Sequence, residues 1–488
     1  MKKALLFSLL SMFLLTGCNT PNEDEPATPE DEPKETYDDF HKDVTFDSKM
    51  INGTSFDMSL HFKSDDFKGN NKQFNQNLAI NSLALSIASR NVEVATKFFS
   101  DLSFEDVFTS ESYDPDKNEN LIAYSFATRR LNDSYLVALS VRGFDYDYME
   151  VVDDFNLGAS DEHLGFKNAS EAVLTSFTSY LSKDKFTNKA LTLWVTGYSR
   201  AGAVAGLVSK AILDNVSTYK TDKYNVFTYT FESPNYASGE NVGYESILNV
   251  VNENDVVIML PPEDFGLSRY GVDINIAKDK DVVEYVNSDY EYMNLEAFHE
   301  KKASITITAP YIECTDVEGG ITSPSAYYEK LYEYLLTEIN DLSEELSLET
   351  REDYDAFFTD LYAFAETLVT GDNLEKIQNY NEVIDMEDLK NDAMVIGAIL
   401  LMAPEFMPEH QIYTFVKKYA DQLELTYDDE KLTYYCDLLQ TLLMKVFSEK
   451  DENGNQPIMV HLGTLVGNID FIIAMHCPET AYSLLKRY

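Results

Sequence analysis

The segment from 191 to 213 constrains the fold of this chain more than any other. Residues 191–196 (LTLWVT) form a short apolar run typical of a buried strand, and residues 201–213 (AGAVAGLVSKAIL) predict a helix whose first turns carry only small side chains. Only four residues, 197–200, separate the two, so the turn between them is sharp. Small side chains let such a helix pack closely on the strand before it, which is typical of a sheet covered by helices.

Strands and helices alternate from about residue 46 to 310. Buried strands are also predicted over 135–141, 226–231 and 247–251, with a fifth strand over 303–308. From about 323 to 450 the apolar residues recur with the helical period instead, and the chain closes with a helix over 479–486. We therefore expect an α/β sheet domain with an all-helical insertion before its C-terminal segment.

The first 18 residues have the features of an export signal. Lys2 and Lys3 precede an apolar run over 4–15, which is shorter than the ~20 residues that a settled membrane-spanning helix needs. The run leads into Thr16, Gly17 and Cys18, and this end resembles the lipobox of bacterial lipoproteins. The resemblance implies that acylated Cys18 anchors an exported protein to the membrane or surface of a bacterial cell. An ordinary cleaved signal with a chance cysteine is the alternative.

Residues 19–45 are acidic and proline-rich, so we expect an extended, solvated tether. The apolar run over 393–403 (AMVIGAILLMA) is too short to span a membrane and is expected to be a buried helix. The predicted divisions are the signal peptide with its lipobox cysteine (1–18), the tether (19–45), the sheet domain (46–322), the helical insert or cap (323–455), and the C-terminal part of the sheet domain (456–488).

The net charge of the chain limits the classes of molecule that it can be expected to bind. The sequence holds 84 Asp and Glu against 38 Lys and Arg, a formal net charge of −46, which repels phosphate backbones and argues against nucleic acid. Hydrophobic residues make up 44% of the chain, which excludes a wholly disordered protein. Cys314, Cys436 and Cys477 lack zinc-ligand spacing and are expected to be buried thiols, with at most one disulfide among them.

One acidic stretch superficially resembles a calcium loop. Asp114, Asp116, Asn118 and Asn120 alternate as calcium ligands do, but Glu119 stands where an EF-hand has glycine. We expect a solvated turn there, and neither a metal nor another cofactor in the protein.

Ser199 lies in the sharp turn after the strand over 191–196. This strand-turn-helix context is that of a nucleophile elbow, in which the turn exposes a serine hydroxyl at the edge of the sheet. The usual Gly-x-Ser-x-Gly pattern is broken, because residue 201 is Ala and the glycine follows at Gly202. A helix-capping serine is the alternative, but the context favours a nucleophile.

A nucleophilic serine needs a base to take its proton and an acid to orient the base. In α/β-hydrolases these residues follow in the order Ser, Asp or Glu, His. Asp255 follows the predicted strand over 247–251 and is expected at the sheet edge beside Ser199, with Glu232 and Asp264 as rivals. The histidines after Asp255 are His299, His410, His461 and His476.

Context leaves the choice among these histidines open. His299 sits in a charged stretch, His410 in the helical insert, and His461 among apolar residues. His476 follows a strand-like run (FIIAM, 471–475) and precedes a helix that Pro478 can start, so its turn suits a catalytic base.

Together these residues form an ordered series that resembles the class 3 (fungal-type) lipases of the α/β-hydrolase fold, particularly their bacterial secreted relatives. The likeness covers about 120–275 and the C-terminus, and it favours His476 as the base. The motifs that carry it, in chain order, are Val141-Arg142-Gly143, His163-Leu164-Gly165-Phe166, Gly197-Tyr198-Ser199-Arg200, Phe231-Glu232-Ser233-Pro234, the loop from Val251 to Val257, Arg269-Tyr270-Gly271, and His476 with Glu479 and Tyr482.

The resemblance implies a mechanism. Ser199 attacks an ester carbonyl, His476 acts as base and then acid, and Asp255 holds the imidazole in place. The backbone N–H groups of Arg200 and Phe144 would form the oxyanion hole.

Three positions depart from the family, which usually has Ser or Thr at Phe144, His at Tyr198 and Gly at Ala201. A missing hydroxyl at position 144 would weaken the oxyanion hole by about 1–3 kcal/mol. The helical insert is also longer than in compact members of the family, and we expect it to cap the site.

We therefore expect a lipid-anchored serine hydrolase of carboxylic esters, with acylglycerols, other lipids or small esters as substrates. The alternative is a non-catalytic surface-binding lipoprotein on a degenerate hydrolase scaffold, an interpretation that Phe144 and Ala201 motivate.

Overall fold

The computed structural model gives the arrangement of most of the chain beyond the predicted tether. The residues it describes are 40–50, 53–114, 122–131, 134–143, 154, 156–158, 161–238, 242–261, 266–278, 280, 282–290, 324, 327–329, 331–334, 346, 351–450, 456–467 and 469–488. The predicted signal peptide, the lipobox with Cys18, and most of the predicted calcium-like turn lie outside these residues.

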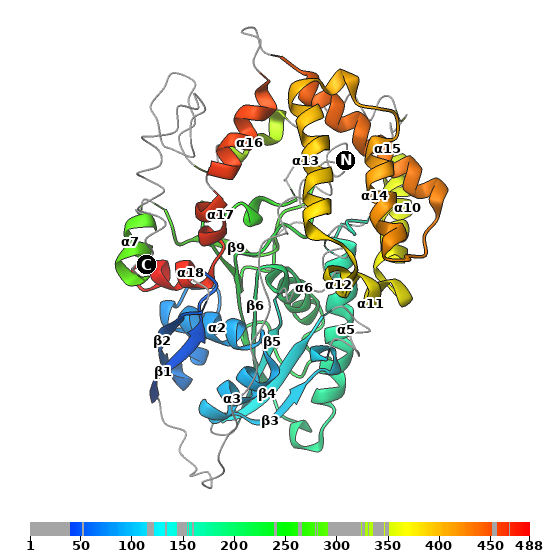
Figure 1. Ribbon diagram of the computed structural model, residues 1–488. Helices are drawn as coiled ribbons and strands as arrows, with labels where there is room; N and C mark the ends of the chain where they lie inside the picture. The colour runs from blue at the N-terminus through cyan, green and yellow to red at the C-terminus, as the bar shows by residue number, and fades with distance from the viewer. Residues whose placement is uncertain are drawn as a thin grey trace.

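Seven strands of the described chain form the central sheet (Figure 1). Strands β3 to β5 pair antiparallel, and β5 to β9 run parallel. Their order across the sheet follows the chain: β3 (Glu105–Thr109), β4 (Tyr124–Leu131), β5 (Ser134–Val141), β6 (Leu191–Tyr198), β7 (Val226–Phe231), β8 (Ile247–Val251) and β9 (Val272–Asn275).

The four strands predicted over 135–141, 191–196, 226–231 and 247–251 are confirmed as β5 to β8. Strands β3, β4 and β9 were not predicted, because β3 and β9 are short, largely solvent-facing edge strands and β4 carries Arg129 and Arg130 before its last residue. The predicted strand over 303–308 lies outside the described residues.

Alternate side chains of the sheet face two different helical layers. On β6, Leu193 and Val195 face the core shared with α5 (Leu164–Leu181) and α6 (Arg200–Asp214). Trp194, on the other side, donates a hydrogen bond from Nε1 to Ser82 Oγ of α2 (Gln76–Ala88) at 2.8 Å. Helices therefore cover both faces of the sheet, and the predicted α/β architecture is confirmed.

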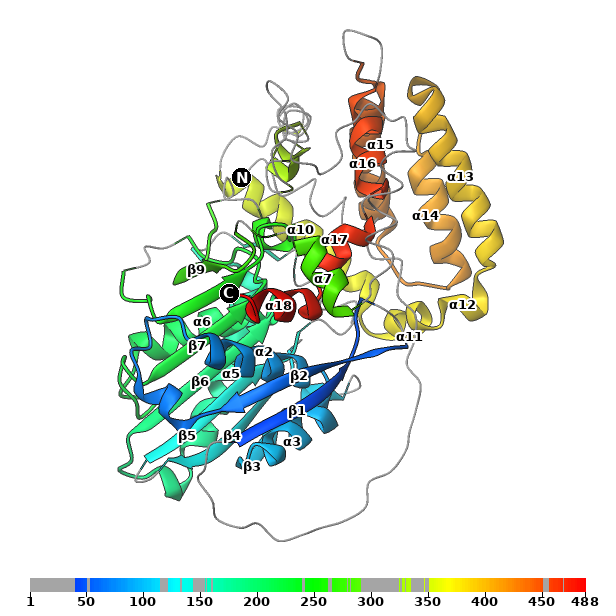
Figure 2. The same cartoon turned by 90° about the vertical axis from the view of Figure 1, so that its left-hand side faces the viewer.

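A hairpin of β1 (Phe40–Asp47) and β2 (Ser55–Phe62) lies on the α2 side of the sheet (Figure 2), with α3 (Val92–Asp101) nearby. The tether was expected to extend to about residue 45, so the folded part begins earlier than predicted. The period-two pattern of β1 is weak because Lys42 stands at an inward-facing position between Phe40 and Val44, whereas alternate residues of β2 are apolar and buried.

The prediction of helices between 323 and 450 is confirmed for the described residues. They lie together at one end of the molecule, away from β1 and β3 (Figures 1 and 2). The helices are α10 (Arg351–Val369), α11 (Asp372–Gln378), α12 (Tyr380–Val383), α13 (Met386–Met402), α14 (Gln411–Gln422) and α15 (Asp429–Ser448).

After this helical part come α16 (Pro457–Gly467), α17 (Ile469–Met475) and α18 (Pro478–Leu485). The run before His476 is therefore helical, and its interpretation as strand-like was wrong: five apolar residues are too few to distinguish the two periods. The closing helix is confirmed as α18. The remaining elements are α7 (Val282–Tyr290) and the short 3₁₀ helices η1 (Ser64–Lys68), η2 (Glu111–Tyr113), η4 (Asp184–Phe186), η5 (Val257–Met259) and η7 (Pro404–Phe406).

The apolar run over 393–403 is only partly buried, which corrects the expectation of a buried helix. Ile396 and Leu400 pack inward, whereas Val395 is 57% exposed and Met402 is 80% exposed. The reason is that α13 packs on α14 and α15 along one face and forms the outer layer of the helical part (Figure 2). No helix among the described residues is both long enough and apolar enough to cross a membrane.

Candidate active site

Ser199 occupies a strained turn between β6 and α6. Its φ is +59° and its ψ is −131°, an uncommon combination for a residue with a side chain. The backbone N–H of Ser199 donates to Phe231 O at 2.7 Å, and its carbonyl accepts from Gly202 N at 2.8 Å. Gly197 is required in this turn, because a Cβ there would lie 2.2 Å from Ala201 O. The turn is thus held from both the neighbouring strand and the following helix.

The displaced glycine of the elbow has a structural reason. A Cβ on Gly202 would lie 3.0 Å from Ser233 Cβ and 3.3 Å from Phe231 O, so α6 lies close to the end of β7 at this position. Ala201 is fully buried among the apolar side chains of the α5 and α6 side, where its methyl group fits. The break in the Gly-x-Ser-x-Gly pattern therefore leaves the turn intact.

The three predicted catalytic residues lie in one chain of hydrogen-bonding contacts. His476 Nε2 lies 2.8 Å from Ser199 Oγ, and His476 Nδ1 lies 2.6 Å from Asp255 Oδ2. Asp255 is fully buried, and its Oδ1 accepts the backbone N–H of Val257 at 2.9 Å. A carboxylate only accepts hydrogen bonds, so Nδ1 carries the proton and Nε2 is left to accept from the serine hydroxyl. This arrangement can remove a proton from Ser199.

The rival histidines that the structure describes have other partners. His410 is exposed and pairs through Nδ1 with Asp437 at 2.7 Å, inside the helical part. His461 stacks on Tyr334, with ring centroids 5.0 Å apart. His299 and the rival acid Asp264 lie outside the described residues, whereas Glu232 lies beside Asp255.

Two side chains that the sequence did not single out for this purpose hold the turn of His476. Tyr198 Oη donates to the backbone carbonyl of His476 at 2.9 Å, and Asn252 Nδ2 donates to that of Met475 at 3.0 Å. Tyr198 therefore ties the residue before the nucleophile to the turn that carries the base. No pattern in the sequence predicts either contact, because each joins segments more than 200 positions apart.

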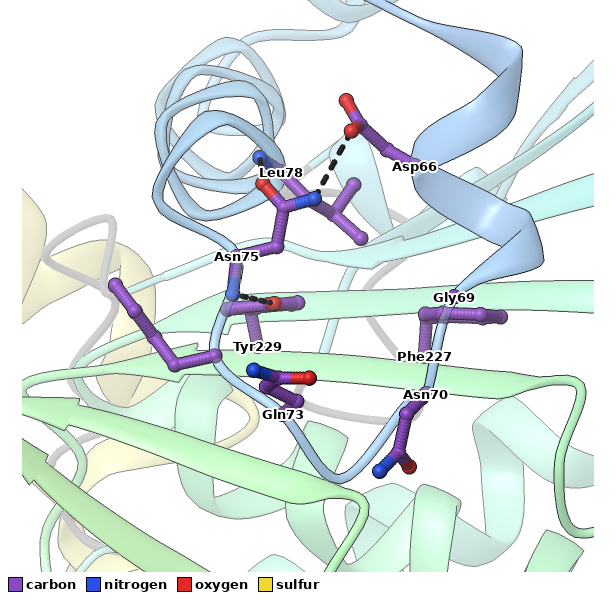
Figure 3. A pocket seen from close by; sticks show the side chains of 9 residues that line it. Asp66, Gly69, Asn70, Gln73, Asn75, Leu78, Phe227 and Tyr229 are labelled. Atoms are coloured by element: carbon purple, nitrogen blue, oxygen red, sulfur yellow. Dashed lines mark hydrogen bonds between the residues drawn. The ribbon is translucent and has the colours of Figure 1, made fainter.

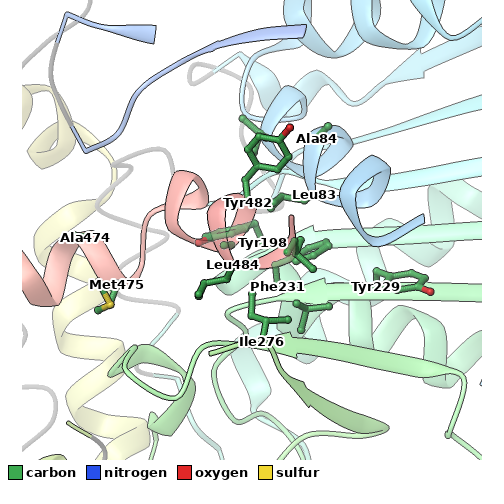
Figure 4. Close-up of a cluster of buried hydrophobic side chains, with 14 of the residues drawn as sticks. Leu83, Ala84, Tyr198, Tyr229, Phe231, Ile276, Ala474, Met475, Tyr482 and Leu484 are labelled. Atoms are coloured by element: carbon green, nitrogen blue, oxygen red, sulfur yellow. The ribbon is translucent and has the colours of Figure 1, made fainter. Parts of the chain in front are cut away.

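Helix α18 fixes this turn from its other side. Figure 4 shows Tyr482 and Leu484 gathered near Leu83 of α2 and near Tyr198 and Phe231 of the sheet. The helix is thereby packed into the same apolar core as the elbow.

Glu479 ties α18 to the N-terminal hairpin. Its Oε1 accepts hydrogen bonds from Ser48 Oγ at 2.7 Å and from the backbone N–H groups of Lys49 at 2.5 Å and Met50 at 3.1 Å. Tyr482 Oη accepts from Ser59 N at 2.9 Å. The closing motif seen in the sequence therefore anchors the turn of His476 to the hairpin.

Asp154 links two of the sequence motifs, although no pattern in the sequence identified it as a residue of the site. Its side chain pairs with Arg200 Nε, and its carbonyl accepts from His163 Nε2 at 2.9 Å. His163 Nδ1 accepts the backbone N–H of Phe166 at 3.4 Å, so the imidazole is neutral with the proton on Nε2. Burial lowers the pKa of His163 to about 4. His163 thus supports the site structurally.

The structure describes one of the two residues predicted to form the oxyanion hole. Arg200 is the first residue of α6, where backbone N–H groups have no partner within the helix. The end of β5 lies next to the elbow, since a Cβ on Gly143 would lie 3.3 Å from Tyr198 O. Phe144 lies outside the described residues, so the second donor stays a prediction.

A separate hollow, shown in Figure 3, lies beside the first residues of β7. It is lined by Asn70, Gln73 and Asn75, among others, and by Phe227, which is the second residue of β7. Glu232 and Asp255, by contrast, follow the last residues of β7 and β8. The hollow is therefore distinct from the candidate active site.

The described residues hold no group of three or more His, Cys, Asp or Glu side chains placed to bind a metal ion. Cys436 and Cys477 are buried, as expected, and neither forms a disulfide within the described residues. Cys314 lies outside the described residues.

Comparison with known families agrees with this geometry. Residues 141–265 match the family described as Lipase (class 3), and this segment holds the elbow and the acid loop. The resemblance to the class 3 lipases is confirmed. The fold is that of an α/β-hydrolase, and the match to class 3 lipases supports a hydrolase of the lipase and esterase type.

Solved lipase structures also align with part of the chain. The lipase from Rhizopus microsporus var. chinensis is 17% identical with a TM-score of 0.32, and the match covers 45% of this chain and 78% of that one. The triacylglyceride lipase from Rhizomucor miehei is 18% identical with a TM-score of 0.33, over 45% and 83% of the two chains. Likenesses of this size do not transfer function. No curated protein matches the sequence.

Proposed function

We propose that the protein is a serine hydrolase of carboxylic esters that acts on lipid or small ester substrates through an acyl-enzyme intermediate. The observation that carries the proposal is the chain of contacts from Ser199 Oγ through the His476 imidazole to Asp255, at 2.8 Å and 2.6 Å. A serine with positive φ at a strand-to-helix turn, facing an imidazole that a buried carboxylate orients, is an arrangement suited to nucleophilic catalysis.

The chemistry follows from these atoms. His476 Nε2 takes the hydroxyl proton as Ser199 Oγ attacks the ester carbonyl, and the imidazolium is stabilised by Asp255. The same proton then passes to the leaving alkoxide, which leaves an acyl group on Ser199. Water, activated by the neutral imidazole, hydrolyses that acyl-enzyme and restores the serine.

The negative charge that develops on the carbonyl oxygen needs donors. The backbone N–H of Arg200 at the start of α6 would supply one, and that of Phe144 would supply the other. Losing one such donor costs about 10²–10³ in kcat in serine hydrolases, so the pair carries a large part of the rate.

We propose that the helical part caps the site. Tyr328 Oη donates to the carbonyl of Asn254 in the acid loop at 3.5 Å, and Tyr327 Oη donates to that of His461 in α16 at 3.3 Å. Both tyrosines are buried. These contacts support a helical layer next to the acid loop, where it would shape access of the substrate to Ser199.

The anchor is proposed to be acylated Cys18, which would hold the protein at the membrane or surface of a bacterial cell. A chain of net charge −46 is repelled by anionic lipid headgroups, so electrostatic adsorption is unfavourable and acyl chains are a more suitable attachment. The acidic tether would then keep the hydrolase away from the bilayer.

The proposal is tested by turnover on a panel of substrates. Short-chain esters, triacylglycerol and phospholipid are compared for the wild-type protein and for Ser199→Ala, with circular dichroism to confirm that the variant folds. We expect turnover of at least one class by the wild type and its loss in the variant. Equal hydrolysis by both proteins, or no hydrolysis of any ester by either, would contradict the proposal and favour the binding-protein alternative.

A further inference from the structure

Glu232 is a second carboxylic acid in the interior beside Asp255. It directly follows β7, its side chain is fully buried, and its φ is +45°. Its Oε2 accepts the backbone N–H of Asn252 at 2.9 Å. The carbonyl of Asn252 in turn accepts the backbone N–H of Asp255 at 2.9 Å. Glu232 is thus bonded to the same short turn after β8 that carries Asp255.

The other oxygen of Glu232 has an unusual environment. Oε1 is buried and receives no hydrogen bond from any donor among the described residues. A buried carboxylate oxygen without a donor is costly, whereas a hydroxyl at this position can donate. Asp255 is the neighbouring acceptor, because Glu232 is bonded to the turn that carries Asp255 and the charge of Asp255 raises the pKa of Glu232.

The surroundings decide which of the two acids holds the proton. Asp255 accepts from His476 Nδ1 and from the backbone N–H of Val257, and these two donors stabilise its anion. Glu232 accepts only one backbone N–H among the described residues. Burial and the charge of Asp255 raise the pKa of Glu232 well above its ordinary value. Two neighbouring buried carboxyls cannot both be ionised, so the proton belongs on Glu232.

Arg269, whose charge acts on Glu232, does not change this assignment. Arg269 has its own acid partner, Asp273, at 2.5 Å, and it also donates to the backbone carbonyls of Ser233 and Ile258. Among the described residues, Tyr198 also interacts with both acids, and Tyr328 and His476 interact with Asp255. Cys477 and Glu479 act on Tyr198.

We propose that Glu232 is a neutral carboxylic acid that donates an Oε1–H hydrogen bond to Asp255 and thereby positions Asp255 beneath His476. Glu232 is then a positioning residue: it contacts neither substrate nor the serine and acts through Asp255. It fixes the orientation of the acid without adding a second negative charge near the imidazole. Its effect on turnover rests on the proposed ester hydrolysis, but its protonation state does not.

Infrared spectroscopy of the whole protein tests the protonation state directly. At pH 8 exposed Asp and Glu are ionised, so a buried protonated carboxyl gives a carbonyl stretch separate from theirs. We expect this band in the wild type, its loss in Glu232→Gln, and its retention in Glu245→Gln, which replaces an exposed glutamate paired with Lys72. A wild type without the band, or a Glu232→Gln protein that keeps it, would overturn the proposal.

Kinetics on a soluble ester tests the positioning. Glu232→Gln keeps a donor toward Asp255 and an acceptor for Asn252 N, whereas Glu232→Leu keeps the approximate volume and loses both. We expect kcat to be about tenfold lower in the Leu variant, with KM unchanged. In the Gln variant we expect kcat to be within about threefold of the wild-type value, and the acid limb of its pH profile to lie at the same pH as in the wild type. A Gln variant as slow as the Leu variant, or an acid limb that moves by a full pH unit, would show that wild-type Glu232 is ionised.

The two tests separate this proposal from the proposed function. If no ester is turned over, the proposed function fails, while the infrared band still decides whether Glu232 is neutral.

Discussion

His476 Nδ1 and Asp255 Oδ2 lie 2.6 Å apart, although 221 positions separate the two residues in the chain. The whole helical part lies between them in sequence, so the active site depends on the return of the C-terminal segment to the sheet. That return is secured by Tyr198 and Asn252 on one side of the turn and by α18 on the other. The helical part can therefore be inserted without displacing the base from the acid.

Replacing the base should abolish activity. We expect His476→Ala to lower kcat by about 10⁴–10⁶, because the serine then has no acceptor for its proton. His410→Ala is the matched control, since His410 pairs with Asp437 in the helical part, and it should retain activity. His299→Ala should also retain it. Steady-state hydrolysis of a soluble ester measures the activity of each variant. This triad would be ruled out if the His476→Ala protein were active and either control protein were inactive.

Tyr198→Phe should slow the reaction without abolishing it. The change removes the hydrogen bond to the carbonyl of His476 in a nearly buried site, and a loss of about 1.4 kcal/mol corresponds to a tenfold drop in kcat. KM should not change. Tyr236→Phe removes a buried hydroxyl that bonds the Tyr270 carbonyl, so it should lower the melting temperature but not kcat. Equal kcat in the Tyr198→Phe and wild-type proteins would contradict the role of this contact.

Gly197→Ala should damage the elbow. Its Cβ would lie 2.2 Å from a backbone oxygen, so the turn must shift, and a displacement near 1 Å costs about 10² in rate. A Cβ added at Gly397 in α13 has no heavy atom within 4 Å, so Gly397→Ala should stabilise the protein by about 0.5–1 kcal/mol without changing activity. Thermal unfolding and kinetics of both variants test this pair. A fully active Gly197→Ala protein would show that the turn is looser than the structure indicates.

The buried imidazole of His163 predicts a loss of stability in mild acid. Its pKa is about 4 in the folded protein and ordinarily about 6.5, so below pH 6.5 the unfolded chain binds a proton that the folded one does not. This contribution is complete above pH 6.5 and is lost as the pH falls to about 4, which amounts to about 3 kcal/mol.

The His163→Gln protein, measured by urea unfolding between pH 4 and 7, should lack this part of the pH dependence. Its absolute stability is not the test, because the substitution also changes packing. Identical slopes for the variant and the wild type would mean that His163 is protonated in the folded protein.

The sequence predicted those features that local patterns determine. Ser199 could be identified because it directly follows a strong apolar strand, Asp255 because it lies in the short loop after another, and His476 because ordered motifs supported it. The contacts of Asp154, Asn252 and Glu232 could not be predicted, since each depends on how distant segments meet in three dimensions. The five residues before His476 and the exposed face of α13 were misjudged, because a short or uniformly apolar run does not reveal its period or its packed side.

The most direct test of the central claim is to locate the residue that an active-site-directed fluorophosphonate modifies. The probe reacts with a serine that a neighbouring base has activated, and mass spectrometry of the digested protein identifies the labelled peptide. We expect a single modification on Ser199 in the wild type and none in a folded Ser199→Ala protein. An unlabelled wild type, or equal labelling of wild type and variant at another residue, would contradict the assignment of Ser199 as the nucleophile.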